Sequence, residues 1–409
     1  MKKIVIIGSG FAGVYVAKQL LKKIKNNASV IMISETNYFL FTPLLHEVAT
    51  GGISRDNIIQ PIKHVFANPL FAFIKDHVTH VDTKKKIVYS SSHQQPYDLL
   101  ILATGSKIDF HGIKGAEQHT IPLRTLHDAY RIKNQVIHTL ALAEQATNPA
   151  LRKKLLTFFI IGGGPTGVEL AGELAEFIKG MLPSHTIKEE EITIILIHRG
   201  EHLLPQLPPK FRTQCQKKLT YLNVKVMLNC TVTEVGKDFI TDQKGKKHTT
   251  GTLFWTAGFS SRTIPLDNKK YPYYRINSFF QVVPHKNILA LGDCAFLEIN
   301  GKRIPMLAQL AVKQAEVAAH NALATLDLSP SLKSYHYRLD GFLISVGQYF
   351  GVAGIQNTYF SGFFAWWLWR TIYLSKLPGL SKKIRVAFDW TLNFFYPRDS
   401  SEVIEMSKK

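Results

Sequence analysis

Two glycine-rich segments carry the residue types and spacing from which chemistry is first expected. The segment GSGFAG covers residues 8–13, and GGGPTG covers residues 162–167. Each follows one apolar run and precedes another, which predicts a turn from a buried strand into a helix. In such a turn the glycines let the backbone approach a pyrophosphate, which then meets the positive end of the helix. Two such turns predict two bound dinucleotides.

The residues around the first glycine segment complete the pattern of a dinucleotide site. Gly8 is expected to permit the tight turn, Gly10 the approach of a phosphate, and Gly13 the packing of a helix on the strand. Glu35 follows the next predicted strand, where a carboxylate can bind a ribose hydroxyl. We therefore predict that this segment binds a dinucleotide.

The second glycine segment lacks the acidic residue that follows the first. Its next predicted strand, residues 192–197, runs into His198 and Arg199. An arginine at this place accommodates a 2′-phosphate, so NADPH is an alternative to NADH. In the other interpretation Glu201 or a backbone carbonyl binds the ribose, and His198 and Arg199 are solvated surface residues. The sequence leaves both interpretations open.

The composition fits a nucleotide enzyme of two or three domains. The chain has 409 residues, of which 45% are hydrophobic, enough for well-buried cores. Cys215, Cys230 and Cys294 form no C-x-x-C pair and have no metal-ligand spacing, so we expect reduced thiols, a cytosolic setting and no metal site. The first strand begins by Ile4, which leaves no room for a signal peptide.

The formal net charge of +20 indicates a polyanionic partner, either nucleic acid or an anionic membrane. Residues 359–396 favour the membrane, because aromatic and basic side chains are interleaved there. An amphipathic helix lying in the headgroup plane is predicted, with a buried core helix or a dimer interface as the alternatives. One face would carry Leu380, Ile384, Ala387, Thr391 and Phe395, and the opposite face Lys382, Arg385, Asp389 and Asn393.

A stretch without charged residues, 341–369, is long enough to span a bilayer, but we do not expect it to do so. Glycines and side-chain amides interrupt it. Residues 342–346 and 349–355 are instead typical of two short strands joined by a turn.

Three further segments place glycines or a carboxylate at the ends of buried strands. Residues 97–106 end in a Thr-Gly turn, and residues 253–258 repeat that form after the second glycine segment. Each is expected to return the chain across a domain boundary, and a helix at residues 126–144 is expected between them. Residues 287–295 contain Asp293, which could accept a hydrogen bond from a ribityl hydroxyl or be a turn residue.

With these segments in view, the chain resembles the type II NADH:quinone oxidoreductases, single-subunit, membrane-attached flavoenzymes, from residue 2 to about residue 398. Single segments recur in ferredoxin and disulfide reductases, but their combination with a basic, aromatic C-terminus is much more specific. The segments are NYFLFTPLLHEVATG at 37–51, GGGPTGVELAGEL at 162–174, NILALGDCA at 287–295 and AQLAVKQ at 308–314, followed by an AWWLW tail.

The resemblance implies an α/β fold with two Rossmann-like dinucleotide-binding domains, the second inserted in the first, and a C-terminal amphipathic membrane-attachment region. The FAD-binding domain would comprise residues 1–115 and 266–328. The NAD(P)H-binding domain would comprise 116–265, and the membrane-attachment and quinone-site region 329–409.

The resemblance also implies the reaction. FAD would bind the first glycine segment and NADH, or alternatively NADPH, the second. Hydride would pass to the flavin and two electrons to a membrane quinone, without proton pumping. The residues implied for cofactor binding are Gly8, Gly10, Phe11, Ala12, Gly13, Glu35, Thr42, Pro43, Ala103, Thr104, Gly105, Gly162, Gly164, Pro165, Thr166, Gly167, His198, Gly258, Gly292, Asp293 and Ala308.

Three residues are implied for catalysis: Glu169, Gln309 and Lys313. Glu169 would link the nicotinamide side to proton uptake at the quinone, with His46 and Lys313 as further candidates; otherwise it would be a charge favoured near a helix N-terminus. The family's AQxAxQ motif is altered, because Lys313 replaces the second glutamine and Gln314 comes one residue late. From the residues alone, 305–325 predict a helix with Gln309 and Lys313 one turn apart.

The expected partners are a membrane quinone, an anionic membrane surface and, from the resemblance, a second copy of the chain. The protein would be peripheral, or monotopic, on the cytoplasmic face of the inner membrane. No nucleic acid is expected. The alternatives are a sulfide:quinone oxidoreductase, which needs cysteines beside the flavin, a ferredoxin-type reductase, and a basic flavoprotein that binds nucleic acid.

Overall fold

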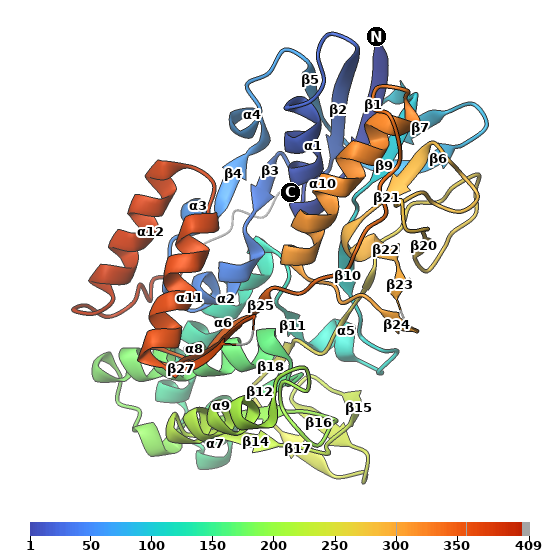
Figure 1. Cartoon of the computed structure of the whole chain (residues 1–409). Coiled ribbons are helices and arrows are strands. Elements are labelled where there is room, and N and C mark those ends of the chain that lie inside the picture. The colour runs from blue at the N-terminus through green and yellow to red at the C-terminus, as the bar shows by residue number, and fades with distance from the viewer. Residues whose placement is uncertain (300, 357, 403–409) are drawn as a thin grey trace. The chain divides into compact units, whose positions relative to one another are not determined.

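The computed structural model describes residues 1–299, 301–356 and 358–402, and the chain divides into two compact units (Figure 1). Unit 1 comprises Met1–Leu40, Ile59–Lys107 and Phe259–Leu339, and unit 2 comprises Phe41–Ile58, Ile108–Gly258 and Asp340–Lys409. Each unit is therefore assembled from segments that lie far apart in the sequence.

A five-stranded parallel sheet forms the centre of unit 1, in the order β21-β9-β1-β2-β5. The last four residues of β1 and all of β9 are buried, as continuous apolar runs in parallel sheets are. Helices α1 and α10 pack against each other. The bounds are β1 (Lys2–Ile7), β2 (Ala28–Ser34), β5 (Phe71–Lys75), β9 (Leu99–Leu102), β21 (Ile288–Ala290), α1 (Phe11–Leu21) and α10 (Ala308–Thr325).

Short strands and turns complete unit 1. Three strands, β6-β7-β8, form an antiparallel sheet, and the other strands pair in twos. Their bounds are β3 (Tyr38–Leu40) with β4 (Ile59–Pro61), β6 (Val78–Asp82), β7 (Ile87–Ser90), β8 (Gln94–Pro96), β20 (Tyr274–Arg275) with β22 (Ala295–Phe296), and β23 (Glu298–Ile299) with β24 (Lys302–Arg303); α4 (Ile62–Val65) and the 3-10 turn η4 (Gly292–Cys294) join them.

Unit 2 contains a second five-stranded parallel sheet, in the order β11-β18-β12-β13-β14. Its central strand β12 is buried throughout and leads into the second glycine segment, as β1 leads into the first. The two sheets confirm the predicted α/β fold with two dinucleotide-binding domains. The bounds are β11 (Ile121–Pro122), β12 (Thr157–Ile161), β13 (Thr193–Ile197), β14 (Val224–Met227) and β18 (Thr252–Trp255).

Helices and a small antiparallel sheet, β15-β16-β17, surround this second sheet. A capping box of Thr125 and Asp128 starts helix α6, which confirms the helix predicted at residues 126–144. The elements are η1 (Thr42–Leu44), α2 (Leu45–Ala49), α3 (Arg55–Ile58), α5 (Ala116–His119), α6 (Leu126–Gln145), α7 (Pro149–Leu155), α8 (Pro165–Met181), η2 (Leu182–Ser184), η3 (Glu189–Glu191), α9 (Pro209–Tyr221), β15 (Val232–Val235), β16 (Phe239–Asp242) and β17 (Lys247–Thr249).

The C-terminal part of unit 2 begins with three antiparallel strands, β25 (Gly341–Ser345), β26 (Gly351–Ile355) and β27 (Thr358–Gly362). Strands β25 and β26 confirm the two short strands predicted at residues 342–346 and 349–355, whereas β27 was not predicted. Two helices follow, α11 (Phe363–Lys376) and α12 (Leu380–Leu392), drawn in red in Figure 1. Within the described residues we find no helix with the length and apolarity needed to cross a bilayer.

Helix α12 turns the predicted apolar face outward. Leu380 and Ile384 on that face are 73% and 62% exposed. The opposite, polar face docks on the protein instead of facing water, since Lys382 donates to the Asp56 carbonyl and Asp389 accepts from the Asn57 amide at 2.7 Å. The predicted helix with two opposite faces is therefore present, and part of its polar face finds polar partners on α3 and beside it.

Candidate functional site

The first glycine segment forms a turn that no larger residue could form. Gly8 has a φ of +110°, and a methyl group there would lie 2.2 Å from the Ala103 carbonyl oxygen. A methyl group on Gly13 would lie 2.0 Å from the Gly8 carbonyl oxygen, so the helix packs directly on the turn. Gly10, in contrast, has nothing within 4 Å of its missing methyl group. The open side of the turn at Gly10 fits a pyrophosphate at the start of α1.

The second glycine segment repeats this arrangement. Gly162 has a φ of +122° and abuts the Thr256 backbone, while a methyl group on Gly167 would lie 1.8 Å from the Gly162 carbonyl oxygen. Gly164 again faces open space within 4 Å. Each unit thus contains one glycine turn, closed on two sides by its own backbone and open on the third at the N-terminus of a helix.

The other residues predicted for cofactor binding divide between the units. Those in unit 1 are Phe11 and Ala12 in α1, Glu35 after β2, Ala103, Thr104 and Gly105 after β9, Gly292 and Asp293 in η4, and Ala308 at the start of α10. Those in unit 2 are Thr42 and Pro43 in η1, Pro165 and Thr166 in α8, His198 after β13 and Gly258 after β18.

The carboxylate of Glu35 stands at the end of β2, as predicted, but it already has partners. Its Oε1 lies 2.6 Å from His77 Nδ1 and also contacts Arg262. Burial alone would raise the pKa of Glu35, but the bonds to Arg262 and His77 outweigh it and lower the pKa. A ribose hydroxyl would therefore share this carboxylate with Arg262 or bind its Oε2.

Asp293 lies in a hollow of unit 1 beside the start of α10. Its Oδ2 accepts a hydrogen bond from Ser106 Oγ at 2.7 Å. Gln314 reaches the same turn, where its Oε1 accepts from the Gly292 N–H at 2.7 Å. The hollow is lined by Ile276, Gly292, Asp293, Ala295, Leu297, Ile304, Pro305, Met306, Leu307, Leu310, Ala311 and Gln314.

Helix α10 carries the altered quinone motif. Gln309 is half-buried in its first turn, and Lys313, one turn later, donates from Nζ to the Arg338 carbonyl oxygen at 3.0 Å. Gln314 is only 6% exposed and turns toward Gly292. The Gln314 side chain is bound to the Gly292 turn of unit 1. Gln314 therefore does not substitute for a glutamine at position 313.

After β13, His198 and Arg199 differ in exposure. His198 Nδ1 lies 3.3 Å from the Gly163 N–H, which can donate to it, so the imidazole closes the second glycine turn. Burial, followed by the charge of Arg199, lowers the pKa of His198. Arg199 is exposed. The histidine is therefore part of the turn, and the arginine alone is available to a ligand phosphate.

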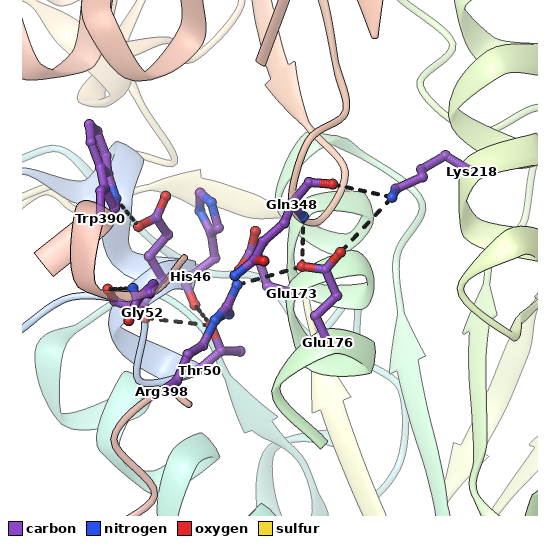
Figure 2. Close-up of polar contacts among 11 residues, drawn as sticks. His46, Thr50, Gly52, Glu173, Glu176, Lys218, Gln348, Trp390 and Arg398 are labelled. Carbon is purple, nitrogen blue, oxygen red and sulfur yellow. Dashed lines mark hydrogen bonds and ion pairs between the residues drawn. The ribbon is translucent and has the colours of Figure 1, made fainter. Parts of the chain in front are cut away.

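Unit 2 also buries a group of charged side chains where α2 packs on α8 (Figure 2). Helix α8 presents Glu169, Glu173 and Glu176, whose spacing puts them on neighbouring turns of one face. Helix α2 adds His46 and Glu47, which are 3% and 4% exposed. We call the four glutamates at positions 47, 169, 173 and 176 the buried carboxylate cluster.

Cations from distant parts of unit 2 balance some of this charge. Arg398 Nη1 lies 2.6 Å from Glu173 Oε2, and its Nη2 lies 3.6 Å from Glu176 Oε2 (Figure 2). Lys218 approaches the other oxygen of Glu176 at 3.9 Å. Arg370 of α11 is the second buried guanidinium that acts on the cluster. Four carboxylates therefore face two buried guanidinium groups.

The carboxyl groups differ in acidity because of this imbalance. Burial raises the pKa of Glu169 well above its ordinary range, and it raises the pKa of both Glu47 and Glu176 to about 7. For Glu173, burial would also raise the pKa, but Arg398 outweighs it and lowers the pKa. The cluster thus holds protons at neutral pH.

His46 is neutral within the cluster. Burial lowers its pKa to about 4. Its Nδ1 lies 3.8 Å from Glu169 Oε2, and because the imidazole is uncharged at neutral pH, this contact is not an ion pair. An uncharged imidazole beside a carboxyl group can accept and pass on a proton.

Sequence reasoning found part of this cluster. Glu169 and the adjacent His46 were named, whereas Glu47, Glu173, Glu176 and Arg398 were missed. The available signal was the spacing of three glutamates along one face of an otherwise apolar helix, since buried carboxylates require partners. Arg398 lies in the C-terminal segment, and no local pattern connects it with α8.

Comparison with known proteins covers almost the whole chain. Residues 2–315 match the family model of the pyridine nucleotide-disulphide oxidoreductases, and residues 340–399 match the NDH2 C-terminal domain. The chain is 30% identical to the type II NADH:quinone oxidoreductase Ndh of Mycobacterium tuberculosis, covering 97% of this chain and 89% of that protein. It is 27% identical to an internal alternative NAD(P)H-ubiquinone oxidoreductase A1, mitochondrial, of Arabidopsis thaliana, covering 98% and 86%.

Among solved structures, NDH2 from Plasmodium falciparum in complex with NADH superposes with a TM-score of 0.88. The alignment covers 98% of this chain and 99% of that one, at 21% identity. This similarity supports the fold described above.

Proposed function

The chain belongs to the type II NADH:quinone oxidoreductases, and we propose that it transfers hydride from NADH to FAD and two electrons onward to a membrane quinone, without pumping protons. The observation that carries this proposal is the pair of glycine turns, each open at Gly10 or Gly164 and each at the end of its own parallel sheet. Unit 1 holds FAD and unit 2 holds NADH. When bound, FAD supplies the two-electron carrier between nucleotide and quinone.

The residues of unit 1 suit a flavin dinucleotide. The N–H groups at the start of α1 face the pyrophosphate at Gly10, and Glu35 binds a ribose hydroxyl. Asp293, in the hollow beside α10, binds a hydroxyl of the ribityl chain. Hydride transfer itself needs no acid or base from the protein, so the task of these residues is orientation and exclusion of water.

Quinone reduction, unlike hydride transfer, needs a proton from the protein. Glu169 supplies it, because burial raises the pKa of this carboxyl group well above its ordinary range and so favours its protonated form. Gln309 and Lys313 donate hydrogen bonds to quinone oxygens. The lysine in place of the second glutamine changes the affinity for quinone more than the chemistry, since both side chains are donors.

NADH is the preferred nucleotide in this proposal, because similar proteins are named NADH:quinone oxidoreductases, and NADPH is the alternative that the residues after β13 leave open. No acidic residue follows β13 directly, and the exposed Arg199 leaves room for a 2′-phosphate. Thr166 and Pro165 begin α8 beside the open Gly164. The ratio of turnover with the two nucleotides tests this point.

A peripheral membrane site on unit 2 completes the proposal. Large apolar side chains are exposed on α11, α12 and the residues that follow, and basic residues stand among them. Such a surface binds the cytoplasmic, anionic face of the inner membrane, and the same region pairs two copies of the chain. The exposed side chains are Phe363, Phe364, Trp367, Leu380, Ile384, Phe388, Leu392, Phe394, Phe395 and Tyr396.

The sulfide:quinone alternative is disfavoured by the thiols. All three cysteines are buried and free, and only Cys294 lies in unit 1, where its Sγ contacts the Leu102 and Leu291 carbonyl oxygens at 3.4 Å. A buried single thiol cannot carry sulfur to a flavin by disulfide exchange.

The test is steady-state turnover of the purified, FAD-loaded protein in detergent. NADH oxidation is measured with a short-chain quinone and with a ferredoxin as acceptor, and quinone reduction is measured with sulfide in place of NADH. The proposal predicts fast turnover only for NADH with quinone. Fast turnover of NADH with ferredoxin, or of sulfide with quinone, together with no turnover of NADH with quinone, would overturn it.

A further inference from the structure

Three buried polar atoms around Glu169 have no hydrogen-bond partner within the described residues. They are His46 Nε2, Ser345 Oγ and Trp369 Nε1, on side chains or residues that are at most 3% exposed. Ser345 also approaches Glu169 through its backbone N–H at 3.4 Å, and the Trp369 indole lies near the same carboxyl group without hydrogen-bond geometry.

Buried polar groups in proteins almost always have a partner, and where the protein offers none the partner is usually an ordered water molecule. Three such atoms, on residues that each approach the Glu169 side chain, therefore indicate internal water near Glu169. The water would connect Glu169 with the imidazole of His46, whose Nδ1 already lies 3.8 Å from it.

Glu47 is the neighbour of His46 in the sequence and the second buried carboxyl group at this place. Its Oε2 accepts a hydrogen bond from Trp390 Nε1 at 2.5 Å, and the contact is fully buried. Trp390 belongs to α12, the helix whose other face is apolar and exposed. A helix of the proposed membrane surface thus touches a protonatable group inside unit 2.

Charged and titratable side chains on each element that packs against Glu47 surround its carboxyl group. The guanidinium groups of Arg370 and Arg398 favour the carboxylate, as does the Trp390 N–H, while Glu173 opposes it. The charged and titratable groups of this surrounding are His46 on α2, Glu169, Glu173 and Glu176 on α8, Arg370 and Tyr373 on α11, Lys133 on α6 paired with Asp399, and Arg398.

We propose that Glu47 is a second proton store for quinone reduction, which exchanges protons with Glu169 through buried water and His46, and that Trp390 is a positioning residue that sets how tightly Glu47 holds its proton. This inference rests on the proposed function. The pKa of about 7 for Glu47 supports it, because the group then releases and regains a proton at neutral pH.

The overall reaction balances with one proton from this store. NADH and a quinone give NAD⁺ and a quinol, and the hydride supplies both electrons and one hydrogen. The second hydrogen is a proton: the O–H bond of a carboxylic acid in the cluster breaks as a quinol O–H bond forms. The carboxylate then regains a proton from water.

The test uses Glu47→Gln and Trp390→Phe in the full-length, FAD-loaded protein. Infrared spectra record the protonated carboxyl band as a function of pH, and turnover is measured with quinone and with ferricyanide, which accepts electrons without protons. Glu47→Gln should remove a component titrating at about pH 7. It should also slow quinone turnover at least about tenfold while ferricyanide turnover persists. Glu190→Gln, on the exposed surface, is the matched control.

Trp390→Phe retains Glu47 and most of the packing around it. This variant therefore tests the role of Glu47 as a proton store even if Glu47→Gln fails to fold. Loss of the N–H donor disfavours the carboxylate, so the titrating component and the pH profile of quinone turnover should both shift to higher pH. If Trp390 had only a structural role, the substitution would lower the stability of the protein but would shift neither the titrating component nor the pH profile of quinone turnover.

Unchanged titration in both variants, or equal loss of quinone and ferricyanide turnover in Glu47→Gln, would overturn the inference. Failure of the proposed function gives a different result: the wild-type protein would reduce ferricyanide but no quinone. The infrared titration requires no turnover. If the protein reduces no quinone, this titration still shows whether Glu47 holds the proton.

Discussion

At the scale of single residues, identical glycines have different tasks because of what surrounds them. A methyl group on Gly13 or Gly167 would collide with backbone, whereas Gly10 and Gly164 face open space. The first pair is required by the fold and the second by the ligand. Substitution at the second pair therefore tests ligand binding without disturbing the turn.

We predict that Gly164→Ala folds normally and retains FAD but is reduced much more slowly by NADH, because the added methyl group occupies the place of a phosphate. Flavin content and the rate of reduction by NADH measure this. The matched variant Gly10→Ala should lose FAD instead. Retention of FAD by Gly10→Ala together with its loss from Gly164→Ala would reverse the assignment of the two turns.

Glu169→Gln should slow reoxidation by quinone by roughly 100-fold, while reduction by NADH stays within about twofold of wild type. The reason is that glutamine keeps the size and polarity of the protonated side chain but has no proton to give. Stopped-flow traces of the two half-reactions separate the effects. Equal slowing of both half-reactions would contradict the role of Glu169 in proton supply.

At the scale of elements, the C-terminal segment is fastened to two helices of unit 2 by adjacent residues of opposite charge. Arg398 pairs with Glu173 on α8, and Asp399 Oδ2 accepts from Lys133 Nζ on α6 at 2.7 Å. A methyl group on Gly51 would lie 2.3 Å from the Asp399 carbonyl oxygen, so the segment also packs closely on the chain after α2. These contacts hold residues 398 and 399 against α6, α8 and the residues after α2.

Arg398→Met should lower the free energy of unfolding by about 3–5 kcal/mol, because it leaves Glu173 buried without its cation. Wild-type Glu173, with its lowered pKa, stabilises the fold above the pKa it has when unfolded. In the variant the largest opposing contribution, that of Arg398, is gone, so burial raises the pKa of Glu173 and the destabilisation should be larger at about pH 8 than at about pH 5.

Thermal unfolding at the two pH values measures this difference. Adding Glu173→Gln to Arg398→Met should restore part of the stability, since the carboxylate closest to Arg398 is then removed together with its cation. A double variant less stable than Arg398→Met at both pH values would show that the pair is not the source of the effect.

Helix α12 should bind lipid through its exposed apolar face. Ile384→Glu and Phe388→Glu place a charge on side chains that are 62% and 61% exposed, so folding should be unaffected while binding to anionic vesicles falls. Vesicle sedimentation measures the bound fraction. Thr220→Glu on α9 adds the same charge elsewhere, and an equal loss of binding in that control would show that net charge alone is responsible.

At the scale of the whole molecule, the two units repeat one plan. In each, a buried central strand leads into a glycine turn and a helix, the next strand lies on one side of it, and a three-stranded antiparallel sheet is added. The plan was predictable from the sequence, because glycine spacing and apolar runs are local. The helix at 126–144 and the strands of the charge-free stretch were predictable for the same reason.

What the sequence could not predict depends on long-range contacts. The docking of the polar face of α12 on α3, the pairing of Arg398 with Glu173, and the partners of Glu35 join residues from distant parts of the chain. Glu47 and Trp390 each look ordinary in their own segments, and only the fold brings them together. Predictions at this level need the packing of helices, which local periodicity does not determine.

The most direct test of the central claim is the anaerobic reaction of the FAD-loaded protein, followed by flavin absorbance. NADH and NADPH are added in separate experiments, and a short-chain quinone is then mixed in. We predict rapid bleaching by NADH, slower bleaching by NADPH, and rapid recovery on addition of quinone. Bleaching without recovery would contradict the account and would make Lys313, the altered residue of the quinone motif, the first to be examined.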